Sequence, residues 1–331
     1  HGAIPVHYTS RRPGHLNDPI PEHYWHIVDP FVALARASAV TTTLKLGTAV
    51  VVVPARNPIP LAKEVATLDM YSGGRFLFGI GVGGLREEAE VLGVDFAHRW
   101  TQGREAVEAM KELWTRDESE YHGAYYDFPA VYSFPKPVQR PHPPVILGSA
   151  APNVFKRVVA WADGWMPTRV SAEEIRHGRE TLTRLATEAG RDPDSIDVAC
   201  MLVVRMTDDP EGLMPSLRER MARLIAEPHV GEVLLERGGF DASILAPIRE
   251  RIAEGDERRA GDIENRQVGL AVRVGEQAHI GDLAGEGLDP GLAVAFFGAD
   301  EHHQPGADLA QRFAVDGDGG LGNPLQQGPH A

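Results

Sequence analysis

The chain alternates short apolar runs with amphipathic stretches over residues 29–208, and this alternation limits its possible folds more than any other feature. The clearest apolar run, LKLGTAVVVV at residues 44–53, is almost entirely apolar and largely β-branched, as expected for a strand buried on both faces. Residues 59–70 follow with apolar side chains at helical spacing, and residues 75–81 form the next apolar run. Strands that alternate with helices, without hairpin signals between them, predict βα units and a parallel sheet.

The same alternation predicts the elements that follow. Further helices are expected at 85–92, 105–114, 152–162 and 172–186, and further strands at 144–148, 164–167 and 195–206. The long connection at residues 120–144 is rich in proline and aromatic residues. Because connections of this length are usually functional, we expect it to form an apolar cover over the site.

Composition excludes several classes of protein. The 331 residues carry a net charge of -14, from 33 basic and 47 acidic residues, so we expect no binding to nucleic acid. No apolar run approaches the roughly 18 to 20 residues that span a bilayer, so no membrane segment is expected. The single cysteine, Cys200, cannot form an internal disulfide, and no Cys and His cluster has zinc-site spacing. We therefore expect a cytoplasmic protein without a metal centre.

Three glycines, Gly79, Gly81 and Gly84, satisfy the dinucleotide-binding pattern G-x-G-x-x-G between a predicted strand and a predicted helix. A nicotinamide dehydrogenase on a Rossmann fold would next place an acidic residue at the end of a strand about 20 positions on. Residues 100–114 read as a helix instead. We favour a glycine-lined rim where the backbone passes close to a flat ring or a neighbouring helix, and strand order will separate the two interpretations.

A turn of small residues leads from the predicted strand at 144–148 into the next predicted helix. Free N–H groups and the positive end of the helix dipole make such a turn a candidate phosphate site, although an ordinary capped turn explains it equally well. Thr168 and Arg169 follow the next strand and either contact an acidic substrate or are merely solvated. No nucleophile arrangement is readable, so the chemistry has to come from a cofactor.

Taken in order, these motifs resemble the luciferase-like monooxygenase superfamily, and within it the actinobacterial oxidoreductases that use the deazaflavin coenzyme F420. The matching stretches cover about the first two-thirds of the chain and are AIPV at 3–6, YWHIVDPFVALA at 24–35, LGTAVVVVPARNPIPLAKEVATLDMYSGGRFLFGIGVGG at 46–84, PKPVQRPHPPVILG at 135–148, DGWMP at 163–167 and AGRDPDSIDV at 189–198.

The resemblance implies an α/β fold, a TIM-type (β/α) barrel that binds its cofactor at the carboxyl ends of the strands. It implies a non-proline cis peptide bond between Ala49 and Val50, in a bulge behind the tricyclic ring. By position it also implies a set of cofactor-binding residues, with ring contacts at Ala49, Val50, Val52, Val82 and Gly83 and phosphate contacts at Gly148, Ser149, Ala150, Ala151, Asn153 and Val154.

The same resemblance gives the chemistry. His1 matches the histidine beside the reactive ring carbon in related deazaflavin enzymes, so it is the candidate catalytic residue, as a proton donor or a substrate ligand. The implied cofactor is F420, with FMN as the alternative. The implied partners are a small-molecule substrate, contacted by Thr168 and Arg169, a flavin or F420 reductase as the electron source, and a second copy of the chain in a homodimer.

Three features depart from the family pattern. The chain starts at the matching histidine, so we expect a barrel that lacks its first strand, first helix and most of its second strand. We expect residues 1–255 to form this barrel domain and residues 256–331 an irregular, partly disordered segment, as though the sequence were damaged at both ends. Gly84 stands where some relatives have a carboxylate or a tryptophan. A non-catalytic flavin- or deazaflavin-binding protein, or an inactive fragment, is therefore the alternative function.

Overall fold

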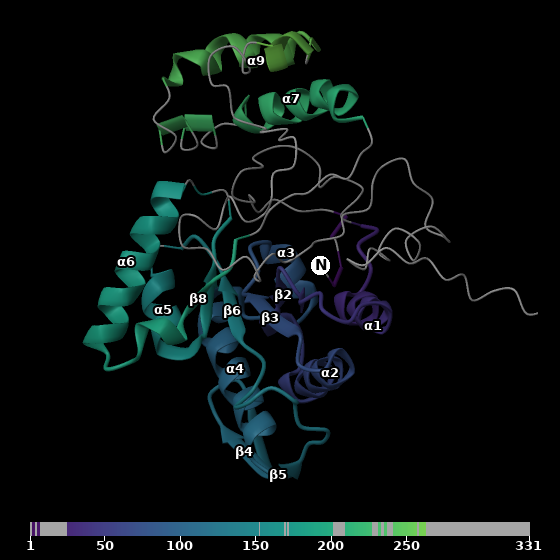
Figure 1. Cartoon of the computed structure of the whole chain (residues 1–331), viewed down its shortest axis with the longest axis vertical. Coiled ribbons are helices and arrows are strands. Elements are labelled where there is room, and N and C mark those ends of the chain that lie inside the picture. The colour runs from purple at the N-terminus through teal and green to yellow at the C-terminus, as the bar shows by residue number, and fades with distance from the viewer. Residues whose placement is uncertain are drawn as a thin grey trace, which may run out of the picture.

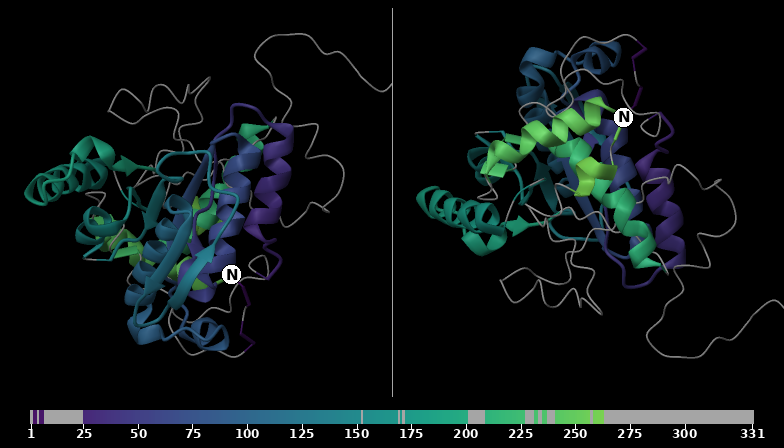
Figure 2. Two further views of the ribbon diagram at one scale, coloured as in Figure 1. Left: turned by 90° about the horizontal axis from the view of Figure 1, so that it is seen from below. Right: turned by 90° about the horizontal axis from the view of Figure 1, so that it is seen from above.

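A computed structural model of the chain describes residues 2–3, 5–6, 25–151, 153–168, 170, 172–200, 209–226, 231–232, 235–236, 241–256 and 258–262. Its centre is a parallel sheet with helices packed around it (Figures 1 and 2). The strands of this sheet are β1 (Leu46–Gly47), β2 (Val51–Val52), β3 (Phe76–Gly81), β6 (Val145–Gly148), β7 (Gly164–Met166) and β8 (Asp197–Val198).

Strand order identifies the architecture. The order is β1-β3-β6-β7-β8, β2 also pairs with β3, and every pairing within this sheet is parallel. The order follows the sequence without the reversal that creates the cleft of a doubly wound sheet, so the Rossmann interpretation is wrong. The predicted TIM-type barrel architecture is confirmed, and in the described part of the chain no pairing between β8 and β1 closes the ring.

The first helix precedes the first strand, and the other helices come after strands of the sheet along the chain. They are α1 (Pro30–Val40), α2 (Pro58–Ser72), α3 (Arg86–Val91), α4 (Arg99–Thr115), α5 (Val154–Trp161), α6 (Ala172–Glu188), α7 (Pro210–Ala226) and α9 (Leu245–Ala253). Consecutive helices pack on one another, with α1 against α2, α2 against α4 and α5 against α6. This arrangement places the helix that follows each strand beside its neighbours around the sheet, as a βα barrel requires.

Local sequence explains where α2 begins and ends. The Asn57 side chain accepts a hydrogen bond from the N–H of Ile59 at 2.9 Å, and Pro58 occupies the first helical position, where its missing N–H costs nothing. Gly73 closes the helix in the left-handed region, with φ of 65°. The predicted helix at residues 59–70 is thus confirmed, together with its glycine stop.

Large apolar side chains fill the space between the sheet and the helices. All six residues of β3 are buried, and Phe76 and Phe78 lie against each other with ring centroids 6.2 Å apart. Trp114 of α4 meets Phe78 edge-on and donates its indole N–H to the carbonyl of Ala62 at 2.9 Å. Burial of whole aromatic side chains stabilises the fold by about 1.5–3 kcal/mol each, and the bond to Ala62 satisfies the buried indole N–H of Trp114.

The apolar run at residues 44–53 is not one continuous strand, as the sequence predicts, but two short strands. β1 ends at Gly47 and β2 begins at Val51, and the peptide bond between Ala49 and Val50 is cis, which confirms the position implied by the resemblance. Thr48 donates its buried hydroxyl to the carbonyl of Gly79 at 2.7 Å. Extended pairing with β3 is interrupted because the backbone bulges here, which a hydropathy pattern does not register.

The connection at residues 120–144 also differs from the prediction. Its first part belongs to a hairpin of β4 (Glu118–His122) and β5 (Asp127–Tyr132), which packs on α4. Its later part is held by Asp69, whose carboxylate accepts from the N–H groups of Val138 and Gln139 at 2.7 and 2.9 Å. The Gln139 side chain also donates to the carbonyl of Phe76, at the amino end of β3. The segment therefore does not cover the carboxyl ends of the strands.

A polar cluster pairs the charged groups at the amino ends of β6 and β7. Asp163 accepts from the N–H of Val145 at 2.9 Å and lies 3.5 Å from the ammonium of Lys111 and 3.7 Å from the guanidinium of Arg191. Arg191 also donates to the carbonyl of Ala162 at 2.7 Å, one of the groups that the end of α5 leaves free. The cluster ties α4, α5 and the sheet together at this end.

Beyond the sheet, α7 and α9 pack against each other around a second, smaller apolar cluster at the far end of the molecule (Figure 1). Ile225 of α7 and Ile248 of α9 are fully buried in it. The predicted strand at residues 195–206 is described only as far as β8 and residue 200, and the rest lies outside the described residues. None of the described helices combines the length and apolar character needed to cross a membrane.

Candidate functional site

The carboxyl ends of β2, β3 and β6 bring together the residues assigned to the cofactor ring. Val50 lies between two glycines of neighbouring strands, and its side chain is 39% exposed. A Cβ atom added to Gly81 would stand 2.7 Å from Cγ2 of Val50, and one added to Gly148 would stand 2.6 Å from its Cγ1. Only glycine at both positions leaves room for Val50, because real Cβ contacts are never this short.

Val52 and Gly83 form the adjoining part of this surface. Val52 pairs with Gly81 in register, and a Cβ on Gly83 would stand 3.1 Å from Cγ1 of Val52. Gly83 has φ of +79°, a conformation that L side chains rarely adopt. Val82 is buried and faces Gly103 of α4, where an added Cβ would stand 2.8 Å from it. Of the glycines predicted to form a rim, Gly81 packs against Val50, and we refer to residues 49–52, 81–83 and 148 as the rim.

The turn after β6 adjoins the rim. The N–H of Ala151 donates to the hydroxyl of Ser149 at 3.0 Å, and the indole N–H of Trp165 donates to the carbonyl of Ser149 at 3.0 Å. Asn153, the N-cap residue of α5, makes no side-chain capping bond, and Val154 is buried. The turn is therefore fixed by Ser149 and by Trp165 of β7, while Ala150 and Asn153 are exposed at the start of the helix.

Of the remaining predicted site residues, the structure describes Thr168 but not His1 or Arg169. Thr168 is exposed and follows β7, at the same end of the sheet as the rim. His1 and Arg169 lie outside the described residues. The backbone N–H of Gly2 donates to the buried carboxylate of Glu88 on α3 at 3.1 Å. At Gly84, an added Cβ would meet no atom within 4 Å.

A groove between the start of α4 and the length of α5 was not predicted from the sequence. It encloses about 330 Å³ and is lined by Trp100, Thr101, Arg104, Asn153, Lys156, Arg157, Ala160 and Trp161. The guanidinium of Arg157 stacks on the ring of Trp100, 3.8 Å from its centroid. The dipeptide Lys156-Arg157, directly after the small-residue turn, is the sequence signal that could have found it.

Arginines around this groove repel one another. Burial and the neighbouring charge of Arg99 lower the pKa of Arg157, and burial and the charge of Arg86 lower the pKa of Arg99. Among the residues that the structure describes, the buried Nε atom of Arg99 has no hydrogen-bond partner. Positive charge therefore accumulates at the end of the molecule that carries the small-residue turn.

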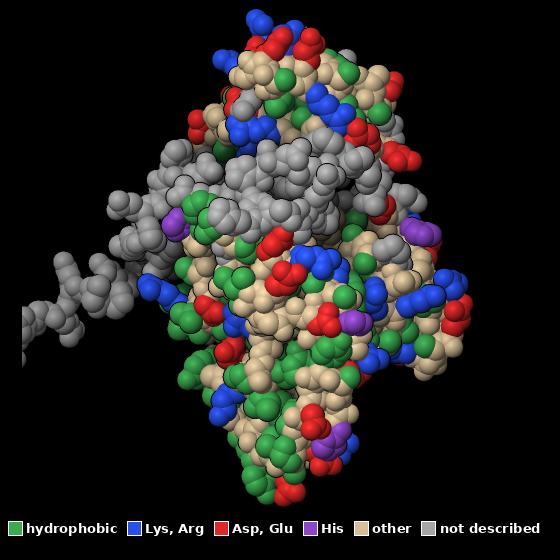
Figure 3. Space-filling model, turned by 180° about the vertical axis from the view of Figure 1, so that it is seen from behind, with side chains coloured by type: hydrophobic (Ala, Val, Ile, Leu, Met, Phe, Trp, Pro, Cys, Tyr) green, Lys and Arg blue, Asp and Glu red, His purple; other side chains and the backbone are tan. Residues whose placement is uncertain are grey.

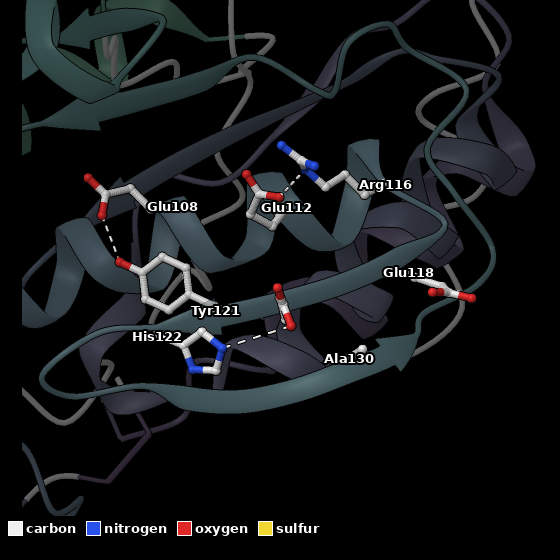
Figure 4. Close-up of a pocket in the computed structure, with 8 residues that line it drawn as sticks. Glu108, Glu112, Arg116, Glu118, Tyr121, His122 and Ala130 are labelled. Atoms are coloured by element: carbon white, nitrogen blue, oxygen red, sulfur yellow. Dashed lines mark hydrogen bonds and ion pairs between the residues drawn. The ribbon is translucent and has the colours of Figure 1, made fainter.

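A larger hollow of about 570 Å³ lies between α4 and the hairpin (Figure 4). Its side chains pair with one another, with the Tyr121 hydroxyl donating to Glu108 at 2.7 Å and Arg116 contacting Glu112. Burial and the Glu108 carboxylate raise the pKa of Tyr121. The hollow lies on the outer side of α4, away from the rim. No group of three or more metal-ligating side chains occurs there or elsewhere in the described ranges.

Comparison with known proteins identifies the family. Residues 19–287 match the model of the luciferase-like monooxygenase family, and the chain belongs to this family. The uncharacterized protein Rv0953c of Mycobacterium tuberculosis is 39% identical over 194 residues, which are 58% of this chain and 68% of that protein. The oxygenase component of the flavin-dependent trigonelline monooxygenase of Acinetobacter baylyi is 38% identical over 130 residues, which are 38% of this chain and 35% of that protein.

Solved structures give the same fold. The coenzyme F420-dependent tetrahydromethanopterin reductase of Methanopyrus kandleri superposes with a TM-score of 0.59 at 25% identity, covering 73% of each chain. The monooxygenase RslO1 of Streptomyces bottropensis superposes with a TM-score of 0.54 at 20% identity, covering 72% of this chain and 82% of that chain. The family thus includes both F420-dependent and flavin-dependent homologues.

Proposed function

We propose that this chain is an oxidoreductase that binds a deazaflavin or a flavin against the rim and uses it on a small organic substrate. The observation that carries the proposal is the convergence of Val50, Gly81 and Gly148 beside the small-residue turn at the carboxyl ends of the strands. A partly exposed valine between two glycines offers a flat ring an apolar surface, and the adjoining helix start suits a phosphate. These residues fit both coenzymes.

When bound, a deazaflavin exchanges a hydride with the substrate, and a reduced flavin also activates oxygen. Val50 and Val52 hold the ring and exclude water from its face, while Val82 supports the rim from its buried position against Gly103 of α4. Ala150, Ala151 and Asn153 orient the phosphate. Thr168 and Arg169 contact an acidic group of the substrate, and His1 donates or holds a proton at the reacting atom. A separate reductase in the cytoplasm supplies electrons.

A homodimer is part of the same proposal. Exposed apolar side chains occur on α1 at Val32 and Val40 and on α2 at Met70 and Tyr71, with exposed fractions between 42% and 72%. Figure 3 shows apolar side chains gathered toward the hairpin end of the face that is hidden in Figure 1. Large exposed apolar patches mark protein–protein contact sites, which favours a second copy of the chain on this side.

The second candidate is a binding protein without turnover, and Gly84 favours it. Glycine supplies no acid or base at this position, and the space around its Cα is open. A chain that binds the coenzyme but transfers no hydride across a broad substrate panel would support this candidate over the enzyme.

The test is a titration with F420 and with FMN, in oxidised and reduced forms, followed by absorbance. We expect the Ala150→Glu variant to weaken binding at least tenfold, because a carboxylate at the turn repels the phosphate. The matched Ala130→Glu variant places the same exposed charge in the hollow beside the hairpin and should bind as the parent chain does. Failure of the parent chain to bind either coenzyme would remove the proposed function.

A further inference from the structure

The groove between α4 and α5 combines positive charge with a position next to the turn assigned to the phosphate. Asn153 belongs to both, because it is the N-cap of α5 and lines the groove. Arg104, Lys156 and Arg157 are the charged side chains in its lining, which includes no carboxylate. This is unusual in a chain whose net charge is -14, since acidic residues outnumber basic ones over the whole sequence.

The cations at the groove are only partly neutralised within the protein. Arg104 lies 3.6 Å from the carboxylate of Glu108. Within the part of the chain that the structure describes, Lys156 and Arg157 form no ion pair; Arg157 stacks on Trp100, and the positive charge of Arg99 acts on it. Like charges held together without acidic partners are costly, and an anionic ligand removes that cost.

We propose that this groove binds carboxylates that continue from the phosphate of the coenzyme, so that it selects a deazaflavin with an anionic tail over FMN. FMN ends at its phosphate, whereas F420 continues beyond its phosphate into a chain of glutamates. A tail leaving the small-residue turn meets Asn153 first, then Lys156 and Arg157 near the start of α5. Lys and Arg are the side chains that best pair with carboxylates, and the groove extends the cofactor site onto the outer surface.

The inference rests on the proposed function and makes the choice of coenzyme testable. The measurement is the dissociation constant for three probes: F420 with several glutamates, the same coenzyme without glutamates, and FMN. For the parent chain we expect the long coenzyme to bind more tightly than the short one, and this advantage to shrink as salt concentration rises. Equal binding of the long and short coenzymes at low salt would overturn the inference.

Variants that remove positive charges from the groove test whether these charges cause the tighter binding of the long coenzyme. Lys156→Gln removes an exposed charge and should weaken binding of the long coenzyme about fivefold, leaving the short coenzyme and FMN unchanged. Adding Arg157→Gln should bring the loss to tenfold or more. Because Arg157 also stacks on Trp100, the single Lys156→Gln variant keeps the test independent of folding. Lys63→Gln, an exposed charge on α2, is the matched control and should change no dissociation constant.

Other outcomes separate this inference from the proposed function. An equal loss for all three probes in Lys156→Gln would mean that the groove acts on the phosphate alone, and it would overturn the tail assignment. Binding of FMN without binding of either deazaflavin would also overturn it, while leaving an enzyme that uses a flavin. Binding of none of the probes would remove both.

Discussion

The two ends of the central sheet are built on different principles. At the amino ends, Asp69 and Asp163 each accept hydrogen bonds from backbone N–H groups, and charged neighbours complete the cluster around Asp163. At the carboxyl ends, the surface consists of valines and glycines, and the nearby Arg99 and Arg157 repel one another. The comparison shows that side-chain hydrogen bonds and ion pairs satisfy the polar groups at the amino ends, whereas the carboxyl ends carry the apolar surface to which we assign the coenzyme.

The largest expected effect is a loss of stability when the hydrogen bonds at the amino ends of the strands are removed. Asp69 is fully buried and accepts three hydrogen bonds from Val138 and Gln139, at 2.6 to 2.9 Å. Asp69→Ala leaves these donors without a partner and should lower the free energy of unfolding by about 3 kcal/mol or more. Chemical denaturation measures it. Asp69→Asn, which keeps one acceptor oxygen, should lose less, and equal losses for both variants would show that the carboxylate charge rather than its geometry matters.

The next effect is at the carboxyl end and should separate binding from stability. Gly148→Ala places a Cβ 2.6 Å from Val50 and must displace that side chain. We expect coenzyme affinity to fall about tenfold while stability falls by only about 1–2 kcal/mol. Titration and thermal unfolding measure the two quantities. Adding Val50→Ala should restore stability because it removes the crowded methyl groups, and Gly84→Ala, with open space around it, should leave stability unchanged.

The smallest expected effect is on the pH dependence of stability, and it again involves a residue at the amino ends of the strands. His142 packs against Trp114, and burial lowers the pKa of its imidazole. Its neutral form is therefore favoured in the folded state, and the stability it contributes is present above the unfolded pKa of about 6.5 and is lost as pH falls through its folded pKa. Between pH 7 and 5, unfolding should become easier by about 1 kcal/mol or less, and His142→Gln should flatten this slope in thermal unfolding.

His122 on the exposed hairpin provides the opposite control for that experiment. A hydrogen bond to Asp127 raises the pKa of His122, so any stability it contributes is present at low pH and is lost as pH rises. His122→Gln should therefore leave the loss on acidification in place. A flatter slope in this variant than in His142→Gln would contradict the assignment to the buried ring.

Much of the fold could be predicted from sequence because apolar periodicity records burial on two faces. The stretch at residues 75–81 predicts β3, and the Asn57 and Gly73 boundaries of α2 follow from capping chemistry. The break at residues 48–50 is different, because apolar residues continue across it, and only the resemblance located the cis bond. The hairpin was missed because its prolines and aromatic residues conceal the alternation of β4 and β5.

The candidate site was predicted unevenly for a physical reason. The rim and the turn come from contiguous motifs, so each could be recognised along the chain. The groove depends on contact between Trp100 and Arg157, which belong to different helices. Side-chain pairing between distant helices follows from how they pack on the sheet, which a single sequence does not specify. Whether His1 acts with these residues stays a prediction, since it lies outside the described residues.

The hairpin also offers a site at which a label can be attached to this protein. Its tip, at Ala124, is exposed on the outer side of α4, and the N–H of the next residue, Tyr125, is anchored to Glu105 at 2.8 Å. A fluorescent label or an affinity handle attached at Ala124 would thus sit on a fixed support. The same loop offers an attachment point for immobilising the chain.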